Sequence, residues 1–156
     1  IIYKPHPDVE TGLRIGAVTS EEALAYTDLI ADTGDAIALI NQVDEVHTMT
    51  SLMGFEALVR SKRVTTYGAP FYAGWGLTTD LGKIPARRHA RIDLDRLIHA
   101  TLIEYPRYFD PKTKQACPIE VVLDRIEASD IPAAHWGTRI LAKVQGIMAS
   151  AQPFWR

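Results

Sequence analysis

The sequence has a single cysteine, Cys117, among its 156 residues. One cysteine excludes an internal disulfide framework and fits a reducing compartment. No apolar run approaches the ~20 residues that a membrane-spanning helix needs. Neither charge sign is in large excess, since the net charge is −2, so the chain as a whole does not attract nucleic acid. These absences favour a cytoplasmic domain that binds no nucleic acid.

The composition is that of a globular protein, with 47% hydrophobic and 23% charged residues. The length is sufficient for one domain with its own core, and we expect a single domain over residues 1–156. The chain opens on the apolar stretch "IIYKPHP" without a methionine. We therefore expect a fragment of a longer protein, since natural termini are usually polar and frayed.

The centre of the chain carries the clearest structural pattern. Residues Asp44 to Met49 are rich in β-formers, "TSLMGFEALVR" (50–60) places apolar side chains on one helical face, and Lys62 to Gly68 is β-rich again. Strand, helix and strand with very short connections form the βαβ unit of a parallel sheet. The sequence therefore predicts an α/β fold with a Rossmann-like parallel sheet.

The flanking segments extend this prediction in both directions. Before the βαβ unit we expect a short strand at Ile1 to Tyr3, a helical turn from Ser20, a strand at Leu29 and a helix from Asp35. After Thr79 we expect helices: one capped by Asp93 and stopped by Pro106, one with Pro118 as its first residue, and one from Pro132. An α/β core of about residues 1–80 is thus followed by a helical section of about residues 81–156.

Thr50 and Ser51 stand where the first central strand turns into the helix. A helix start offers unpaired N–H groups and the positive end of a dipole, so it is a candidate anion site. Gly54 would allow a ligand to approach closely, and Glu56 would reach a ribose diol. The alternative is that Ser51 is only a helix cap and Glu56 only a solvated side chain.

The stretch "KPHPD" forms a second candidate site. His6 is held between two prolines just after a strand, where a rigid imidazole can donate to a phosphate or a leaving group. Lys4 adds positive charge. The alternative is a strand terminator with a surface histidine. Because the carboxyl ends of parallel strands share one edge of a sheet, we expect His6 and Ser51 to face the same edge.

Other candidates are weaker. We interpret His47 as structural, and a metal site built from His6, Asp8 and His47 matches no known ligand spacing, so we expect no metal. Cys117 reads as a helix cap. The basic stretch "ARRHAR" (86–91) is either a solvated loop or a contact with an acidic sugar, a phosphate or a membrane surface. The stretch "YPRYFDP" (105–111) reads as a structural turn.

The loop "GAPFYAGWGLT" (68–78) follows the second central strand and has three glycines and three aromatic residues. Together with "KPHPD", "DEVHTMTSLMGFEALVRSKRVTTYGAPFYAGWGLTTD" (44–80) and "LIEYPRYFDP" (102–111), it resembles the capsule polysaccharide biosynthesis proteins of the KpsC/LipA type. The resemblance runs from about Tyr3 to about Arg125. It implies a bacterial retaining β-Kdo transferase that uses CMP-β-Kdo and builds a Kdo linker on a phosphatidylglycerol-type lipid. Such modules have two Rossmann-like lobes around a cleft, the GT-B arrangement.

The resemblance implies roles for individual residues. It assigns His6 and Pro7 to donor binding, with His6 stabilising the leaving group, and Ser51 with Thr50 to the CMP phosphate. Glu56 is similar in position to the ribose-binding acid of GT-B enzymes, by fold analogy. The loop would bring its backbone close to the donor and wall the cleft, through Gly68, Gly74 and Gly76 and through Phe71, Tyr72 and Trp75. The alternative is a plug between the sheet edge and the later helices.

One departure from the family pattern is large. The part that would form the acceptor lobe is missing, and no acid is in the context of a catalytic nucleophile; Asp8 and Asp80 are the nearest. We therefore expect the donor-binding C-terminal lobe of one module, without a metal or cofactor, located in the cytoplasm or at the inner membrane. Its partners would be CMP-Kdo, a lipid-linked acceptor, the missing lobe and a capsule-export complex. The alternative is a non-catalytic assembly or binding domain of the capsule machinery.

Overall fold

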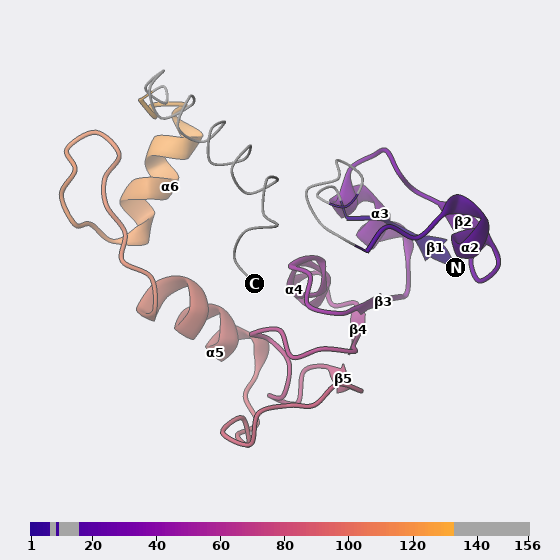
Figure 1. The fold of residues 1–156 in the computed structure, drawn as a ribbon. Helices are drawn as coiled ribbons and strands as arrows, with labels where there is room; N and C mark the ends of the chain where they lie inside the picture. Colours follow the sequence, from indigo (N-terminus) through magenta and orange to yellow (C-terminus); the bar gives the residue numbers. More distant parts are fainter. Residues whose placement is uncertain (7–8, 10–15, 133–156) are drawn as a thin grey trace, which may run out of the picture. The chain divides into compact units, whose positions relative to one another are not determined.

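The computed structural model describes residues 1–6, 9 and 16–132 (Figure 1). The chain forms two compact units, one of residues 1–33 with 130–156 and one of residues 34–129. The expected helix from Pro132 lies outside the described residues, as do Pro7 and Asp8. A single domain over the whole chain stays a prediction.

The first unit contains a two-stranded parallel sheet. Strand β1 (Ile2–Tyr3) pairs with β2 (Leu29–Ile30), and α2 (Ser20–Leu24) comes between them in sequence. Thr19, rather than Ser20, caps α2: its hydroxyl accepts the Glu22 N–H while the Glu22 carboxylate accepts the Thr19 N–H. This reciprocal capping box satisfies two N–H groups that a helix start otherwise leaves unpaired.

The second unit holds a three-stranded parallel sheet in the order β3–β4–β5. Strand β3 (Glu45–Thr48) pairs along its whole length with β4 (Arg63–Thr66), and α4 (Met53–Val59) forms the crossover. The predicted βαβ unit and α/β class are therefore confirmed. The sequence pattern did not reveal β5 (Thr79–Asp80), because two residues are too short for an alternating pattern.

The core of the second unit lies between this sheet and its helices. α3 (Ala36–Gln42), which Asp35 caps, contributes Ile40. The other buried side chains come from both central strands, α4, the aromatic loop and α5, namely Val46, Phe55, Ala57, Leu58, Val64, Tyr72 and Leu97. The aromatic loop is therefore anchored in the same core as the βαβ unit.

The first helix after Thr79 begins where the sequence predicts it, directly after Asp93. The segment from 81 to 93 contains no helix, and α5 (Leu94–Ile98) starts after Asp93, whose carboxylate accepts the Arg96 N–H. α5 continues directly into the π-helical turns of η1 (His99–Glu104). α6 (Ile119–Glu127) follows Pro118, which stands just before the helix rather than as its first residue.

Asp110 connects the turn after η1 to α6. Its carboxylate is 5% exposed and accepts hydrogen bonds from the Arg125 guanidinium at 3.1 Å and from the Lys112 N–H at 2.9 Å. Those bonds, together with the Arg125 charge and the Thr113 hydroxyl, lower the pKa of Asp110 from 3.8 to about 2. Within the stretch 105–111, Asp110 therefore has a structural role, whereas Tyr105 and Phe109 are largely exposed.

Replacing Gly54 by alanine should destabilise the protein. A Cβ at this position would lie 2.7 Å from Tyr72 Cζ, and closer still to the hydroxyl oxygen. Overpacking of this kind costs about 1–3 kcal/mol, whereas helix propensity alone would favour alanine by about 1 kcal/mol. Urea denaturation measures whether the free energy of unfolding falls or rises. A more stable G54A protein would contradict the packing, and the loss should be smaller when G54A is made in a Tyr72→Phe background.

Replacing Asp110 by asparagine should free α6 from the turn. Because the folded-state pKa is lower than the unfolded one, the carboxylate adds stability above about pH 4 and loses it as the pH falls to about 2. Asp110→Asn should speed amide exchange in α6 at neutral pH and remove this part of the acid dependence. The exposed Asp44→Asn is the control. An unchanged acid profile in Asp110→Asn would refute the assignment.

Candidate functional site

Ser51 lies between the end of β3 and the start of α4, in a fixed conformation. Its N–H donates to Thr48 Oγ1 at 3.2 Å, and its Oγ accepts the Met53 N–H at 3.2 Å. Its carbonyl accepts the Tyr72 hydroxyl and the Gly54 N–H. One hydrogen of the Ser51 side chain is left to donate, and the backbone around it is held from both sides.

α4 begins two residues after Ser51. Leu52 occupies the N-cap position with helical dihedral angles and makes no side-chain capping bond. The helix-cap alternative for Ser51 fits this contact, since Leu52 already has helical dihedral angles and the Ser51 hydroxyl accepts the Met53 N–H two residues on, as an N-cap side chain does. Thr50, next to Ser51, is exposed. Its methyl carbon lies 2.8 Å from the position that a Cβ on Gly68 would take.

The space in front of Gly54 belongs to Tyr72 rather than to a ligand. The Tyr72 ring fills the position that a Gly54 side chain would take, so the expectation of ligand access at Gly54 is corrected. Tyr72 itself is 0% exposed: its ring lies against Gly54 of α4, and its hydroxyl donates to the Ser51 carbonyl. Burial raises the pKa of Tyr72 to about 12, so the phenol remains a donor.

Glu56 forms an ion pair with Arg60 one helical turn later. Their closest atoms, Glu56 Oε2 and Arg60 Nη1, lie 2.7 Å apart, and the same nitrogen donates to the Glu56 carbonyl at 2.9 Å. Both side chains are partly exposed. The second carboxylate oxygen of Glu56 can still accept a hydroxyl hydrogen.

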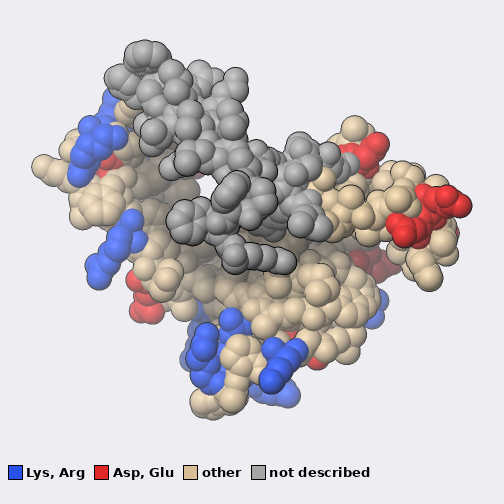
Figure 2. Space-filling model, viewed as in Figure 1, with Lys and Arg blue, Asp and Glu red and all other residues tan. Residues whose placement is uncertain are grey.

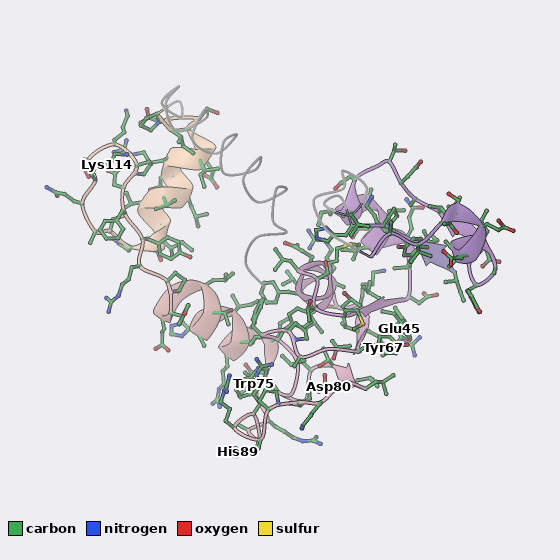
Figure 3. All side chains as sticks on the ribbon, viewed as in Figure 1. Glu45, Tyr67, Trp75, Asp80, His89 and Lys114 are labelled. Atoms are coloured by element: carbon green, nitrogen blue, oxygen red, sulfur yellow. The ribbon has the colours of Figure 1, made fainter. Side chains whose placement is uncertain are left out.

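Asp80, at the end of β5, holds the aromatic loop (Figure 3). Its carboxylate accepts the Gly74 N–H at 2.9 Å and the hydroxyls of Thr66 at 2.9 Å and Thr78 at 2.6 Å. The Thr66 side chain is fully buried, so its hydroxyl depends on this bond. Sequence reasoning considered Asp80 as a nucleophile, whereas its contacts make it a structural acceptor.

Arg88 binds the same loop through its carbonyl groups. Its Nη1 donates to the carbonyls of Ala69, Pro70 and Ala73, and its guanidinium lies 5.9 Å from the centre of the Trp75 ring. This arginine comes from the "ARRHAR" stretch, where neither interpretation anticipated an internal role. Arg88 stands twelve residues after Gly76, the last glycine of the loop, and the sequence carries no sign of this contact.

The loop has a buried part and a surface part. Tyr72 and Ala73 are fully buried, which fits the plug alternative, while Phe71 is 39% exposed and Trp75 is partly exposed. Gly74 and Gly76 have φ of +85° and +83°, a region that glycine adopts without strain. A side chain at Gly74 would also collide with Ile84 and Arg88. These glycines therefore serve the internal packing of the loop.

His6 and His47 have separate settings. His6 is exposed in the first unit, and its carbonyl accepts the Val9 N–H; Lys4 beside it donates to the Ala31 carbonyl at 3.1 Å. His47 in β3 lies 3.1 Å from the Tyr67 hydroxyl and 3.4 Å from a Glu45 carboxylate oxygen. His47 thus joins two neighbouring strands on one sheet face, in line with its structural interpretation.

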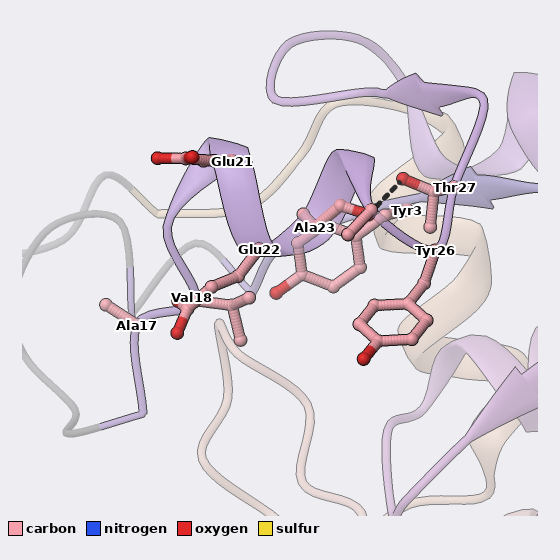
Figure 4. A pocket seen from close by; sticks show the side chains of 9 residues that line it. Tyr3, Ala17, Val18, Glu21, Glu22, Ala23, Tyr26 and Thr27 are labelled. Atoms are coloured by element: carbon pink, nitrogen blue, oxygen red, sulfur yellow. Dashed lines mark hydrogen bonds between the residues drawn. The ribbon is translucent and has the colours of Figure 1, made fainter.

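A pocket of about 750 Å³ lies within the first unit (Figure 4). Its walls include Tyr3, Tyr26, Glu21 and Glu22, and none of the predicted site residues lines it. Thr27 in its wall donates to the Ala23 carbonyl at 2.9 Å. Two carboxylates at the wall disfavour an anionic ligand, so we do not place a phosphate there.

Comparisons with known proteins identify the family. Residues 1–108 match the family described as capsule polysaccharide biosynthesis protein. The chain is 56% identical over 120 residues to the capsule polysaccharide modification protein LipA of Neisseria meningitidis serogroup B, and 46% identical over 108 residues to the lipopolysaccharide-processing protein LpsZ of Rhizobium meliloti. These matches cover 77% and 69% of this chain. The chain belongs to the capsule polysaccharide biosynthesis family.

Solved structures support the same relationship. The β-Kdo 2,7 transferase of Thermosulfurimonas dismutans KpsC matches 83% of the chain with 37% identity and a TM-score of 0.70. The β-Kdo 2,4 transferase of the same protein matches 80% with 35% identity and a TM-score of 0.64. The chain spans 17% of LipA, 24% of LpsZ and about two fifths of each KpsC chain.

Within the described residues no helix is long and apolar enough to cross a membrane.

Replacing Asp80 by alanine should loosen the aromatic loop. The buried Thr66 hydroxyl and the Gly74 N–H would lose their acceptor, which costs about 1–3 kcal/mol for an unsatisfied buried group. We expect faster hydrogen exchange at the Gly74 amide and a red shift of tryptophan emission as Trp75 gains solvent. Asp80→Asn, which keeps one acceptor oxygen, should be intermediate. The exposed Asp44→Ala variant is the control. If the Gly74 amide exchanges as slowly in Asp80→Ala as in this control, Asp80 does not hold the loop.

Proposed function

We propose that this chain is the CMP-Kdo-binding lobe of a β-Kdo transferase of the GT-B type, which acts in capsule polysaccharide biosynthesis. The observation that carries the proposal is the β3–α4–β4 unit with Thr50 and Ser51 at the carboxyl end of β3. Ligands of parallel α/β sheets bind beyond that end of the strands. The similarity to two Kdo transferase structures supports the choice of donor.

Ser51 is suited to bind the phosphate of CMP. Its hydroxyl already accepts the Met53 N–H, which leaves the O–H to donate to a phosphate oxygen. Exposed Thr50 adds a second hydroxyl next to it. When the bond between the Kdo anomeric carbon and the phosphate oxygen breaks, the electron pair goes to CMP. Fixed donors stabilise the charge that develops there.

Glu56 completes the proposed donor site within the second unit. One oxygen of Glu56 would accept the ribose hydroxyls while Arg60 holds the other, which fixes the orientation of the carboxylate. For His6 and Pro7, in the N-terminal stretch of the chain, a role in donor binding stays a prediction from the family resemblance. The acceptor would be a lipid-linked Kdo or phosphatidylglycerol-type molecule, held by a second lobe outside this chain.

Titration with CMP tests the proposal. We expect the chain to bind CMP in preference to UMP, with amide shifts at Thr50 and Ser51, because the site would read the base as well as the phosphate. Ser51→Ala should weaken binding about 10- to 100-fold, the effect of losing one hydrogen bond to a charged group. Ser20→Ala, at the exposed start of α2, is the matched control.

Equal affinity for CMP and UMP, or unchanged CMP binding in Ser51→Ala, would refute the donor site. In the full-length protein, His6→Ala should lower the transfer rate while circular dichroism shows an intact fold. If neither this chain nor the full-length protein binds CMP, a non-catalytic assembly domain becomes the better interpretation.

A further inference from the structure

The segment between β5 and α5 has an unusual local charge. From 81 to 92 it carries four full positive charges, Lys83, Arg87, Arg88 and Arg91, together with His89, and no acidic residue. The acids at its two ends are engaged internally, since Asp80 binds the aromatic loop and Asp93 caps α5. A chain with a net charge of −2 thus has one strongly positive segment.

Only one of these cations is used inside the fold. Arg88 binds the three loop carbonyls, whereas Lys83, Arg87, His89 and Arg91 are exposed. Among the described residues, none forms an ion pair with any of these four side chains. Figure 2 shows basic side chains gathered at the lower end of the visible face, in the region where Figure 3 labels His89.

The rest of the segment holds the charges outward. The Arg88 N–H donates to the Pro85 carbonyl in a turn, and the Ile92 N–H donates to the Trp75 carbonyl at 3.2 Å. The stem of Arg91 lies against Gly76, 3.4 Å from where a Cβ would be. Leu81, two residues before Lys83, is 63% exposed. The exposed cations and this leucine therefore belong to a segment that contacts the aromatic loop through Ile92 and Arg91.

We propose that this basic segment, residues 81–92, docks on an anionic lipid bilayer. Lys83, Arg87, His89 and Arg91 are all exposed along one short segment, which suits a diffuse negative surface. An anionic bilayer attracts each nearby basic side chain and also accepts an exposed leucine, which an acidic polysaccharide would not bury. The inference does not depend on donor binding, and it would bring the loop 68–76 near the membrane surface.

Vesicle co-sedimentation of this chain tests the docking. We expect binding to phosphatidylcholine vesicles with about 30% phosphatidylglycerol, and none to pure phosphatidylcholine. Arg87→Gln with Arg91→Gln should weaken binding about 30-fold, since each basic side chain near such a surface contributes roughly fivefold. Raising the salt from about 0.1 M to about 1 M shortens the Debye length from ~10 Å to ~3 Å and should abolish binding.

The control removes the same charge elsewhere in the second unit. Arg63→Gln with Arg96→Gln changes the net charge equally, but these arginines face Glu45 and Asp93 at 3.7 and 3.8 Å. Binding that survives in this control and fails in the Arg87/Arg91 variant supports the proposal. No binding to the anionic vesicles, equal binding to both vesicle types, or equal loss in the control overturns it. CMP affinity, measured on the same samples, reports on the donor site separately.

Discussion

The buried hydroxyl of Tyr72 is the contact around which the second unit is arranged. It donates to the carbonyl of Ser51 and occupies the space left by Gly54. The loop of residues 68–76, the start of α4 and the end of β3 are thereby fixed to each other. Without this contact the Ser51 carbonyl would keep only the Gly54 N–H as a donor, and the loop would lose one of its links to α4.

Two charged residues extend this anchor to the whole loop. Asp80 accepts one N–H and two hydroxyls, while Arg88 donates to three carbonyls of the loop. The Arg88 charge is thus stabilised by backbone carbonyls, and the Asp80 charge by one backbone N–H and two side-chain hydroxyls. A loop rich in glycine, which loses much conformational freedom on folding, is in this way held in one conformation next to the proposed phosphate site.

Residues 68–91 connect the proposed donor site to the proposed membrane surface, and their arginines have different roles. Arg88 faces inward and stabilises the loop, whereas Arg87 and Arg91 on either side face solvent. A transferase with a lipid-linked acceptor must work where its soluble donor and its membrane-bound acceptor meet. The loop 68–76, fixed next to the proposed donor site and followed by the basic segment, would let the enzyme bind its donor close to the membrane.

The sequence by itself determined the parallel βαβ unit, the placement of Ser51 at a strand end, and the family, because hydrophobic periodicity and long motifs are local properties of the chain. It left open what the glycines, Tyr72, Asp80 and Arg88 do, and it missed β5. Those answers depend on contacts between residues distant in sequence, such as Gly54 with Tyr72 and Arg88 with Ala69. Only the tertiary structure decided that Gly54 makes room for a tyrosine and that one arginine of a basic stretch faces inward, since packing space and carbonyl direction have no local sequence signal.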